Sequence, residues 1–266
     1  MTSVSEFMKA APARLEGNTP WASRYAGELR RVVVEQANGS ARNVQRHLGP
    51  SELGVPCDRQ VVGKLAGVPA TNHVADPWPS IVGTAVHAWL ADAFTAANAG
   101  LDFPRWLAEQ RVVPHPDHSG TGDLYDAKES AVVDHKVLGE SSMAKIRSVA
   151  GPPIKYIIQL ILYGKGFRLM GLPVTRVALA AYPRTAASLD GLYVWERATG
   201  PQDDALIEEV FALTGRRKQM AEEIISGRLT LTDIPTSADD SECFFCPFYR
   251  PQSKRDNGPG CPGPNS

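Results

Sequence analysis

The stretch from Gly120 to Lys136 limits the possible folds more than any other part of the chain. Residues 131–138 are rich in valine and follow a period of two, a pattern typical of a β-strand. Residues 121–126 can pair with that strand as an antiparallel hairpin, with its turn at residues 128–129. Lys-Glu is an unusual pair for a two-residue turn, so the register rests on the strand pattern. The sequence therefore predicts a hairpin around which the rest of the chain is organised.

Three charged side chains meet in this predicted hairpin. The register puts Asp123 directly opposite Asp134, and strand alternation puts Lys136 on the same face as Asp134. Two facing carboxylates repel each other, so removal of Asp134 would relieve repulsion in a metal-free protein. A divalent cation between them would turn this repulsion into a net attraction. The lysine could then place a positive charge beside an anionic substrate, as in a metal-dependent phosphodiesterase. The alternative is a surface hairpin with solvated charges, because Asp-x-Lys alone is a weak pattern.

Hydrophobic periodicity and breaker residues predict the remaining elements. We expect helices at residues 60–65, 80–97, 154–169 and 201–228, and further strands at residues 110–113, 174–182 and 192–196. Residues 140–147 are expected to form a helix or a loop, and the strand at 110–113 is expected at a sheet edge because prolines follow it. This order predicts an α/β fold with a mixed central sheet flanked by helices.

Two of the predicted helices carry polar residues beside an apolar face. In the first, an apolar stripe that includes Trp89 runs next to His87, and Gly83 one turn earlier would permit close approach of another backbone. In the second, Gln159 and Tyr163 lie four residues apart on one face. Each of these polar side chains is either a hydrogen-bonded core or boundary residue or part of a site.

Composition excludes some classes of protein. The apolar fraction of 43% indicates a globular protein with a substantial core, and the net charge of −1 gives no overall attraction to nucleic acid. Residues 1–17 lack the apolar segment of a signal peptide, and residues 156–162 are too short to cross a bilayer. We therefore expect a cytoplasmic protein that does not bind membranes. Arginines of the N-terminal region either line a groove for a nucleic-acid backbone or form a solvated face; they are Arg14, Arg24, Arg30, Arg31, Arg42 and Arg46.

The chain contains four cysteines: Cys57, Cys243, Cys246 and Cys261. In the cytoplasm, four cysteines indicate metal binding or redox chemistry before disulfides. The last three lie in residues 236–266, a Pro/Gly-rich segment that is poor in regular structure and needs a covalent or metal crosslink.

Taken together, the motif order resembles a known family. The chain is similar to RecB-type nucleases of the PD-(D/E)XK superfamily, and more narrowly to the iron–sulfur members, the Cas-four nucleases of CRISPR adaptation and the nuclease domain of AddB. The resemblance covers roughly residues 51–262. It rests on a helical histidine, Gly-Asp, Asp-His-Lys, Gln-x-x-x-Tyr and one early plus three late cysteines; these are His87, Gly122-Asp123, Asp134-His135-Lys136, Gln159, Tyr163, Cys57, Cys243, Cys246 and Cys261.

The resemblance implies roles for these residues. His87, Asp123, Asp134 and the backbone carbonyl of His135 would bind Mg²⁺ or Mn²⁺. Lys136 would position or activate the attacking water, while Gln159 and Tyr163 would brace the site and hold the DNA end. The four cysteines would ligate a [4Fe–4S] cluster. Two departures stand out: many relatives carry Glu in place of Asp134, and Cys261 follows Cys246 after a longer gap than the family's pattern.

These implications give a full functional expectation. We expect a restriction-endonuclease-like fold with a helical segment at residues 1–50, a nuclease core at 51–235 and an iron–sulfur segment at 236–266, joined in one integrated domain. The expected activity is a sequence-independent DNA exonuclease in recombination, repair or CRISPR-adaptation-like processing, working with a recombination or adaptation protein. Two alternatives stay open: a catalytically silent adaptor that binds DNA ends, and a nucleic-acid-binding module stapled by zinc.

Overall fold

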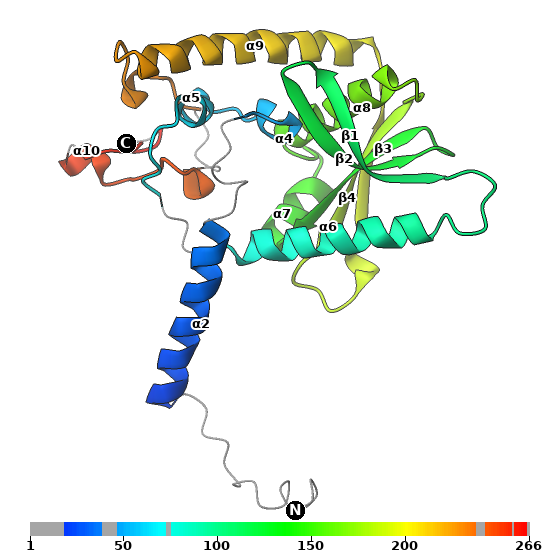
Figure 1. Ribbon diagram of the computed structural model, residues 1–266, viewed down its shortest axis with the longest axis horizontal. Helices are drawn as coiled ribbons and strands as arrows, with labels where there is room; N and C mark the ends of the chain where they lie inside the picture. Colours follow the sequence, from blue (N-terminus) through cyan, green and yellow to red (C-terminus); the bar gives the residue numbers. More distant parts are fainter. Residues whose placement is uncertain (1–18, 39–46, 73–75, 238–242, 257, 265–266) are drawn as a thin grey trace, which may run out of the picture. The chain divides into compact units, whose positions relative to one another are not determined.

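The computed structural model describes residues 19–38, 47–72, 76–237, 243–256 and 258–264 (Figure 1). The chain divides into two compact units, one formed by residues 1–44 with 75–77 and the other by residues 45–74 with 78–266. In the first unit the described element is helix α2 (Pro20–Asn38), whose Arg24, Arg30 and Arg31 are exposed. Arg14, Arg42 and Arg46 lie outside the described residues.

The second unit is built on one five-stranded mixed sheet in the order β1-β2-β3-β4-β5. The strands are β1 (Trp106–His115), β2 (His118–Asp126), β3 (Ala131–Leu138), β4 (Arg176–Pro183) and β5 (Tyr193–Ala198). Strands β3 and β4 run parallel and every other neighbouring pair is antiparallel. The predicted mixed sheet flanked by helices is confirmed, and the predicted strand at residues 110–113 is the middle of the longer edge strand β1.

The β2–β3 hairpin has the predicted register but a longer turn. Leu124 pairs with Val133, and the next positions outward are Asp123 and Asp134. The connection is the four-residue loop 127–130 rather than a two-residue turn. Asp126 explains the difference, because its Oδ1 accepts the backbone N–H groups of both Lys128 and Glu129, at 3.0 and 3.3 Å. An aspartate in this position commonly organises a turn through its own side chain.

Helices cover both faces of the sheet (Figure 1). Helix α6 (Trp78–Ala96) packs on β1 to β3, where Phe94 stacks parallel on His135 with ring centroids 5.5 Å apart. Helix α8 (Ile154–Leu169) packs on the other face, where Gln159 bonds Asp134, the neighbour of His135 on β3. Adjacent strand residues point to opposite faces, so α6 and α8 sandwich β3. The main core lies between the sheet and α8 and includes Tyr125, Val132, Leu160, Phe167 and Val177.

The other helices form a second layer around α8. They are α4 (Pro50–Leu53), α5 (Asp58–Ala66) and the long α9 (Pro201–Ile225), which share an apolar core with α8. Helix α7 (Glu140–Arg147) resolves the predicted choice between helix and loop. Short elements complete the unit: η1 (Leu189–Gly191), η2 (Leu231–Asp233), η3 (Cys243–Phe245) and α10 (Ser253–Asp256).

Helix α6 differs from its predicted amphipathic pattern. Trp89, which was placed in the buried stripe, is 66% exposed, while Leu90 is buried. Among the described residues, a Cβ built on Gly83 would meet nothing within 4 Å, so no described backbone uses the close approach that this glycine permits. The helix lies on only three strands, and one side of it therefore stays open. No helix in the described ranges is both long enough and apolar enough to cross a membrane.

Midway along strands β1 and β2, the alternation of side chains between the two faces of the sheet is interrupted. Leu107 and Val112, five residues apart, both pack against the core cluster on the α8 side, which a regular alternation forbids. Likewise Tyr125 stacks on Phe167, and a Cβ on Gly122 would meet the same ring at 2.9 Å. The irregularity falls at residues 109 and 123, where Glu109 has a φ of +50°.

Candidate functional site

The face change brings acidic side chains of two strands to a histidine of helix α6. His87 Nδ1 lies 3.5 Å from Asp123 Oδ2. Glu109 is opposite Asp123 in the β1–β2 register, which pairs Ala108 with Leu124 and Gln110 with Gly122. Ligand atoms of His87, Glu109 and Asp123 all lie within 4.8 Å of one another. The three side chains therefore form a compact set that could hold a metal ion.

Glu109 is the member of this set that sequence reasoning missed. The predicted strand begins at Gln110, whereas β1 begins at Trp106, so the prediction stops one residue short of Glu109. Nothing in the local pattern marks a face change. The positive φ of Glu109 is rare for a residue with a Cβ, and strained backbone of this kind clusters at functional sites. A longer strand prediction paired with β2 would have placed Glu109 opposite Asp123.

On the α8 side, Asp134 is completely buried and held by two partners. Lys136 Nζ lies 2.6 Å from Asp134 Oδ2 as an ion pair, and Gln159 Nε2 donates to Asp134 Oδ1 at 2.8 Å. Lys136 Nζ also donates to Gln159 Oε1 at 3.2 Å. Gln159 Nε2 lies 3.1 Å from the hydroxyl of Tyr163. The structure thus brings together Asp134, Lys136, Gln159 and Tyr163 in one hydrogen-bonded network.

His135 joins the two halves of the site through its backbone. Its N–H donates to Asp123 Oδ2 at 2.7 Å, so β3 fixes the orientation of the Asp123 carboxylate. Its buried ring packs against Phe94 and edge-on to Tyr182, and neither ring nitrogen has a hydrogen-bond partner in the described part of the chain. Burial lowers the pKa of His135 to about 4, which keeps the ring neutral. The predicted role of its carbonyl as a metal ligand stays a prediction.

The charges of the site shift one another's pKa values. The hydrogen bond to Asp123 raises the pKa of His87 despite its partial burial. Burial opposes ionisation of Asp123, but His87 and Lys136 outweigh it and the pKa of Asp123 is lowered. Burial and the nearby Asp123 charge raise the pKa of Glu109. Burial raises the pKa of Asp134 to about 6, the main counter-effect being the charge of Lys136. Crowded carboxylates with opposed shifts are typical of sites that act on protons or metals.

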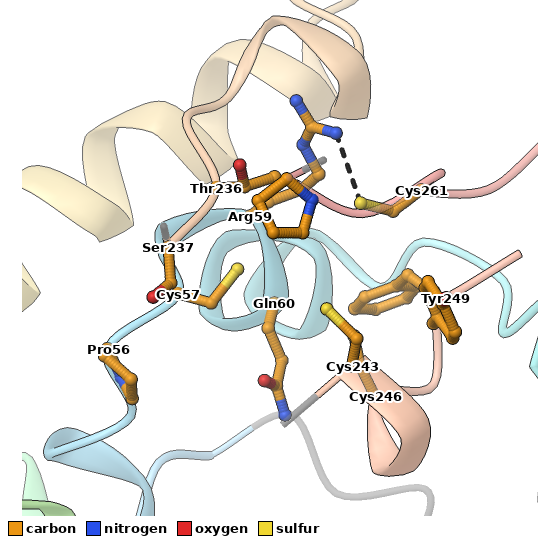
Figure 2. Close-up of a pocket in the computed structure, with 12 residues that line it drawn as sticks. Pro56, Cys57, Arg59, Gln60, Thr236, Ser237, Cys243, Cys246, Tyr249 and Cys261 are labelled. Carbon is orange, nitrogen blue, oxygen red and sulfur yellow. Dashed lines mark hydrogen bonds between the residues drawn. The ribbon is translucent and has the colours of Figure 1, made fainter. Parts of the chain in front are cut away.

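The four cysteines line one pocket at the N-terminal end of α5 (Figure 2). Cys57 immediately precedes α5, Cys243 and Cys246 bracket the turn η3, and Cys261 comes from the C-terminal segment. All four are free thiols. All four lie in the described ranges, yet no three of their sulfurs fall within 4.8 Å of one another. Burial raises the pKa of Cys246 to about 11.

Side chains of α5 and the following loop hold the C-terminal segment against this pocket. Arg59 Nε and Nη2 donate to the carbonyls of Ile234 and Thr232, both at 2.8 Å, and its Nη1 lies 3.2 Å from Cys261 Sγ. Asn72 Nδ2 donates to the carbonyl of Cys246 at 2.8 Å. These long-range bonds explain how cysteines nearly two hundred residues apart in sequence come to share one pocket.

The ion pair at the start of α5 fixes the first cysteine. Arg217 of α9 is almost fully buried; its Nη2 lies 2.7 Å from Asp58 Oδ1 and also donates to the carbonyl of Val55 at 2.8 Å. Asp58 is the neighbour of Cys57, so α9 holds the N-terminal end of α5 in place.

Comparison with known proteins gives distant structural likenesses. No family model matches the sequence, and no curated protein matches it. The alkaline exonuclease LHK-Exo from Laribacter hongkongensis is 12% identical, with a TM-score of 0.47 over 69% of this chain and 93% of that chain. The same exonuclease in complex with dAMP is 14% identical, with a TM-score of 0.45 over 71% and 97% of the two chains. The crystal structure of SSO0001 is 15% identical, with a TM-score of 0.44 over 84% and 94%. These values are too low to assign a function, which must be argued from the site.

Proposed function

We propose that this chain is a divalent-metal-dependent deoxyribonuclease that hydrolyses phosphodiester bonds at DNA ends. The observation that carries the proposal is the compact set of His87, Glu109 and Asp123, which the backbone of His135 joins to the buried pair of Asp134 and Lys136. A metal next to carboxylates and one lysine is the arrangement that phosphodiester hydrolysis needs. The proposed superfamily is the PD-(D/E)XK nucleases, which the motif order resembles.

The donor set fits Mg²⁺ or Mn²⁺. Carboxylate oxygens from Glu109 and Asp123 suit a hard cation, and the His87 nitrogen is compatible with Mn²⁺. Asp134 Oδ2 is buried and, among the described residues, lacks a hydrogen-bond donor in good geometry, although Lys136 lies beside it. When bound, the ion would polarise the scissile phosphate and lower the pKa of a bound water. His87, Glu109, Asp123 and Asp134 are the residues that would hold it.

The remaining site residues orient charge around the reacting phosphate. Lys136 is cationic and nearly buried, so it can stabilise negative charge that develops on the phosphate. Gln159 bonds both Lys136 and Asp134, which fixes the spacing between the cation and the carboxylate. The N–H of His135 orients Asp123. A network this closely braced limits the reorganisation needed in the transition state.

The catalytically silent adaptor is the second candidate. Asp123, Asp134 and Lys136 are all present and in contact with partners, whereas a decayed nuclease site usually lacks one of them. The choice of DNA ends as substrate rests on the motif resemblance. The sequence has no base-reading motif, so we expect contacts mainly with the phosphate backbone. Binding through the phosphate backbone should weaken as salt rises.

For the cysteine pocket we propose a structural [4Fe–4S] cluster. Tetrahedral zinc, with Zn–S bonds of about 2.3 Å, would draw its thiolates to within about 4 Å of one another. No three of the sulfurs here lie within 4.8 Å of one another, which favours a larger group held by four thiolates. Burial of Cys246 disfavours a free thiolate, and a cationic centre would compensate it. The pocket is separate from the carboxylates, so the cluster would stabilise the fold without a part in hydrolysis.

Nuclease assays test the proposed activity directly. Anaerobically purified protein is incubated with end-labelled linear DNA and with circular DNA, in Mn²⁺ or in EDTA. We expect Mn²⁺-dependent loss of the linear substrate and survival of the circle. Asp134→Ala and Lys136→Ala should each reduce cleavage at least about a hundredfold.

An exposed residue on helix α6, which carries His87, provides the control. Trp89→Ala on α6 should retain folding and Mn²⁺ binding. Binding of DNA ends without cleavage in Mn²⁺ would favour the adaptor. Cleavage by Asp134→Ala at the wild-type rate would refute the proposed site.

A further inference from the structure

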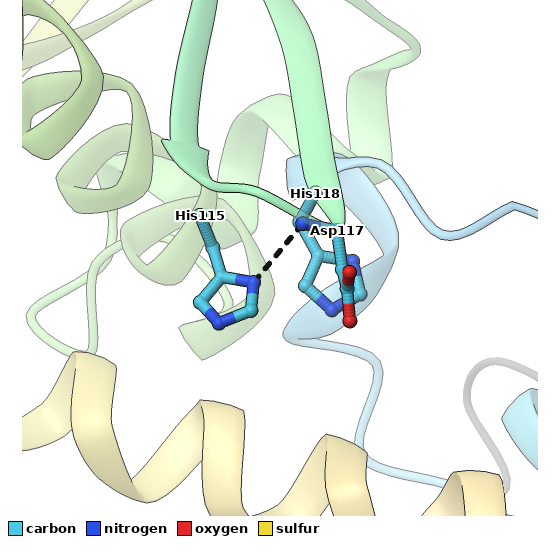
Figure 3. Close-up of side chains that lie close together, drawn as sticks. All are labelled: His115, Asp117 and His118. Atoms are coloured by element: carbon cyan, nitrogen blue, oxygen red, sulfur yellow. Dashed lines mark hydrogen bonds between the residues drawn. The ribbon is translucent and has the colours of Figure 1, made fainter.

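A second group of possible metal ligands lies at the β1–β2 turn, which reads His115-Pro116-Asp117-His118 (Figure 3). Ligand atoms of His115, Asp117 and His118 lie within 4.8 Å of one another. His115 and His118 are cross-strand partners that close the hairpin, so their side chains leave from the same face. Pro116 restricts the backbone of the two-residue turn between them. The local chain geometry therefore presents two imidazoles and a carboxylate together.

The hydrogen bond of His118 fixes the ring tautomer that can bind a metal through Nε2. Nδ1 lies 2.9 Å from the carbonyl oxygen of Leu48, and a carbonyl can only accept, so Nδ1 carries the proton. The lone pair is then on Nε2. A metal-binding histidine usually donates its other N–H to a carbonyl or carboxylate in this manner. His118 is only 3% exposed, so its ring is held in this orientation by the surrounding structure.

The surroundings of the other two side chains leave room for an ion. His115 Nδ1 accepts a long hydrogen bond, 3.2 Å, from the N–H of Asp117, and binding at either ring nitrogen requires only the loss of that bond. Phe211 of α9 packs against both histidine rings and supplies an apolar wall. Asp117 and His118 also line a hollow of about 370 Å³, which can admit an ion with its remaining water ligands.

We propose that His115, Asp117 and His118 form a binding site for a borderline transition-metal ion of the Zn²⁺ class, distinct from the catalytic site. Two imidazoles and one carboxylate suit Zn²⁺, Co²⁺ or Ni²⁺ better than Mg²⁺, which prefers oxygen ligands. The ion would pin the tip of the β1–β2 hairpin.

Lys218 provides a way to distinguish this proposal from a simple salt bridge. Its Nζ lies 2.7 Å from Asp117 Oδ2, so in the metal-free protein the carboxylate is paired with a lysine. A metal ion at Asp117 would either displace the ammonium group of Lys218 or be repelled by it, and both weaken metal binding. Removing the lysine should therefore strengthen metal binding. If the hollow instead binds an anion through Lys218 and the histidines, removing the lysine should weaken binding.

Calorimetric titration of the full chain, freed of metal with a chelator, tests the site with ZnCl₂ alone and with inorganic phosphate alone. Wild type, His115→Ala, Asp117→Asn and Lys218→Ala share the same cysteines and the same catalytic residues, so differences among them report this site. We expect His115→Ala and Asp117→Asn each to weaken one class of Zn²⁺ binding at least about tenfold. Lys218→Ala should tighten that same class, and Zn²⁺ should raise the melting temperature of wild type more than that of Asp117→Asn.

Three results would overturn the proposal. The first is unchanged Zn²⁺ binding in both His115→Ala and Asp117→Asn. The second is weaker Zn²⁺ binding in Lys218→Ala. The third is phosphate binding that depends on Lys218 together with the lack of a Zn²⁺ site. Asp117 is exposed on the turn, so if His115→Ala fails to fold, unchanged Zn²⁺ binding in Asp117→Asn alone overturns the proposal.

Discussion

Lys136 Nζ lies 2.6 Å from Asp134 Oδ2, and the two side chains are 18% and 0% exposed. Burial raises the pKa of Asp134 to about 6. Burial also disfavours the charged form of Lys136. The carboxylates of Asp134 and Asp123 have the larger combined effect, and they raise the pKa of the lysine. The lysine therefore stays cationic, and its charge depends on Asp134 for compensation.

Loss of Asp134 should destabilise the metal-free protein. The sequence pattern predicts the opposite, because it places Asp123 and Asp134 face to face, where the two carboxylates should repel. The structure shows that Asp134→Ala would leave the cation of Lys136 without its closest partner, which in buried pairs costs about 3 kcal/mol. Urea denaturation in EDTA measures this change. The double variant Asp134→Ala/Lys136→Met should recover part of the loss. An Asp134→Ala protein as stable as wild type would contradict the buried ion pair.

Backbone strain at Glu109 makes a second prediction. At an ordinary strand position, a protein with Gly is less stable than the same protein with Ala by about 0.5–1 kcal/mol. At a φ of +50° the order should reverse, so Glu109→Gly should be more stable than Glu109→Ala by about 1 kcal/mol without metal. Both variants should bind Mn²⁺ at least about tenfold more weakly than wild type, as calorimetry would show.

Ser130 is the matched control, since it has the same φ of +50° in the β2–β3 loop. Ser130→Gly should also be more stable than Ser130→Ala, yet neither should change Mn²⁺ affinity. If Glu109→Gly is less stable than Glu109→Ala while the Ser130 pair behaves as expected, Glu109 is not strained.

The pairing of neighbouring strands and the spacing of residues along a helix were enough to predict part of the site. The β2–β3 register follows from residues 121–138 alone, and the structure pairs Leu124 with Val133 as that register requires. The side chains of Asp123 and Asp134 nevertheless contact different helices, His87 of α6 and Gln159 of α8 respectively. Helical spacing predicted that Gln159 and Tyr163 share a face, and their side chains are in contact. Both inferences are local, because they concern neighbours within one hairpin or one helix.

Other features depend on contacts that a linear pattern cannot contain. Glu109 reaches the site only because β1 and β2 change faces, and the sequence shows no sign of that irregularity. Trp89 is apolar but exposed, because α6 lies on only part of the sheet. The meeting of Cys57 with Cys261 depends on hydrogen bonds from Arg59 to a segment far along the chain. The motif resemblance suggested that meeting, whereas spacing alone could not.

His87 provides a third prediction, which separates a ligand from a core histidine. Its side chain is 27% exposed and its ion-pair contact is the 3.5 Å approach to Asp123. His87→Ala should therefore change the metal-free unfolding free energy by less than about 1 kcal/mol. The affinity for Mn²⁺ should fall at least about tenfold. Thr84→Ala, at an exposed position of the same helix, should change neither quantity. A large loss of metal-free stability with unchanged Mn²⁺ affinity would identify His87 as a packing residue.

The fourth prediction concerns the cysteine pocket. Anaerobic protein should contain iron and acid-labile sulfide in equal amounts, four of each per chain for a [4Fe–4S] cluster, together with broad visible absorption. Cys57→Ser and Cys246→Ser should be colourless and melt at lower temperature, since the cluster joins the start of α5 to the C-terminal segment. Phe244→Ala, a 70% exposed residue between two of the cysteines, should keep its iron.

Cys261 is the decisive member of this set. It follows a long gap in the sequence, yet it lines the pocket and accepts a contact from Arg59 at 3.2 Å. Its backbone is also fixed, because its N–H donates to the carbonyl of Phe248 and its carbonyl accepts from the N–H of Arg250. Cys261→Ser should therefore lose iron to the same extent as Cys57→Ser. Full retention of iron and sulfide in Cys261→Ser would remove this residue from the ligand set, and stoichiometric zinc without sulfide in wild type would replace the cluster by a zinc site.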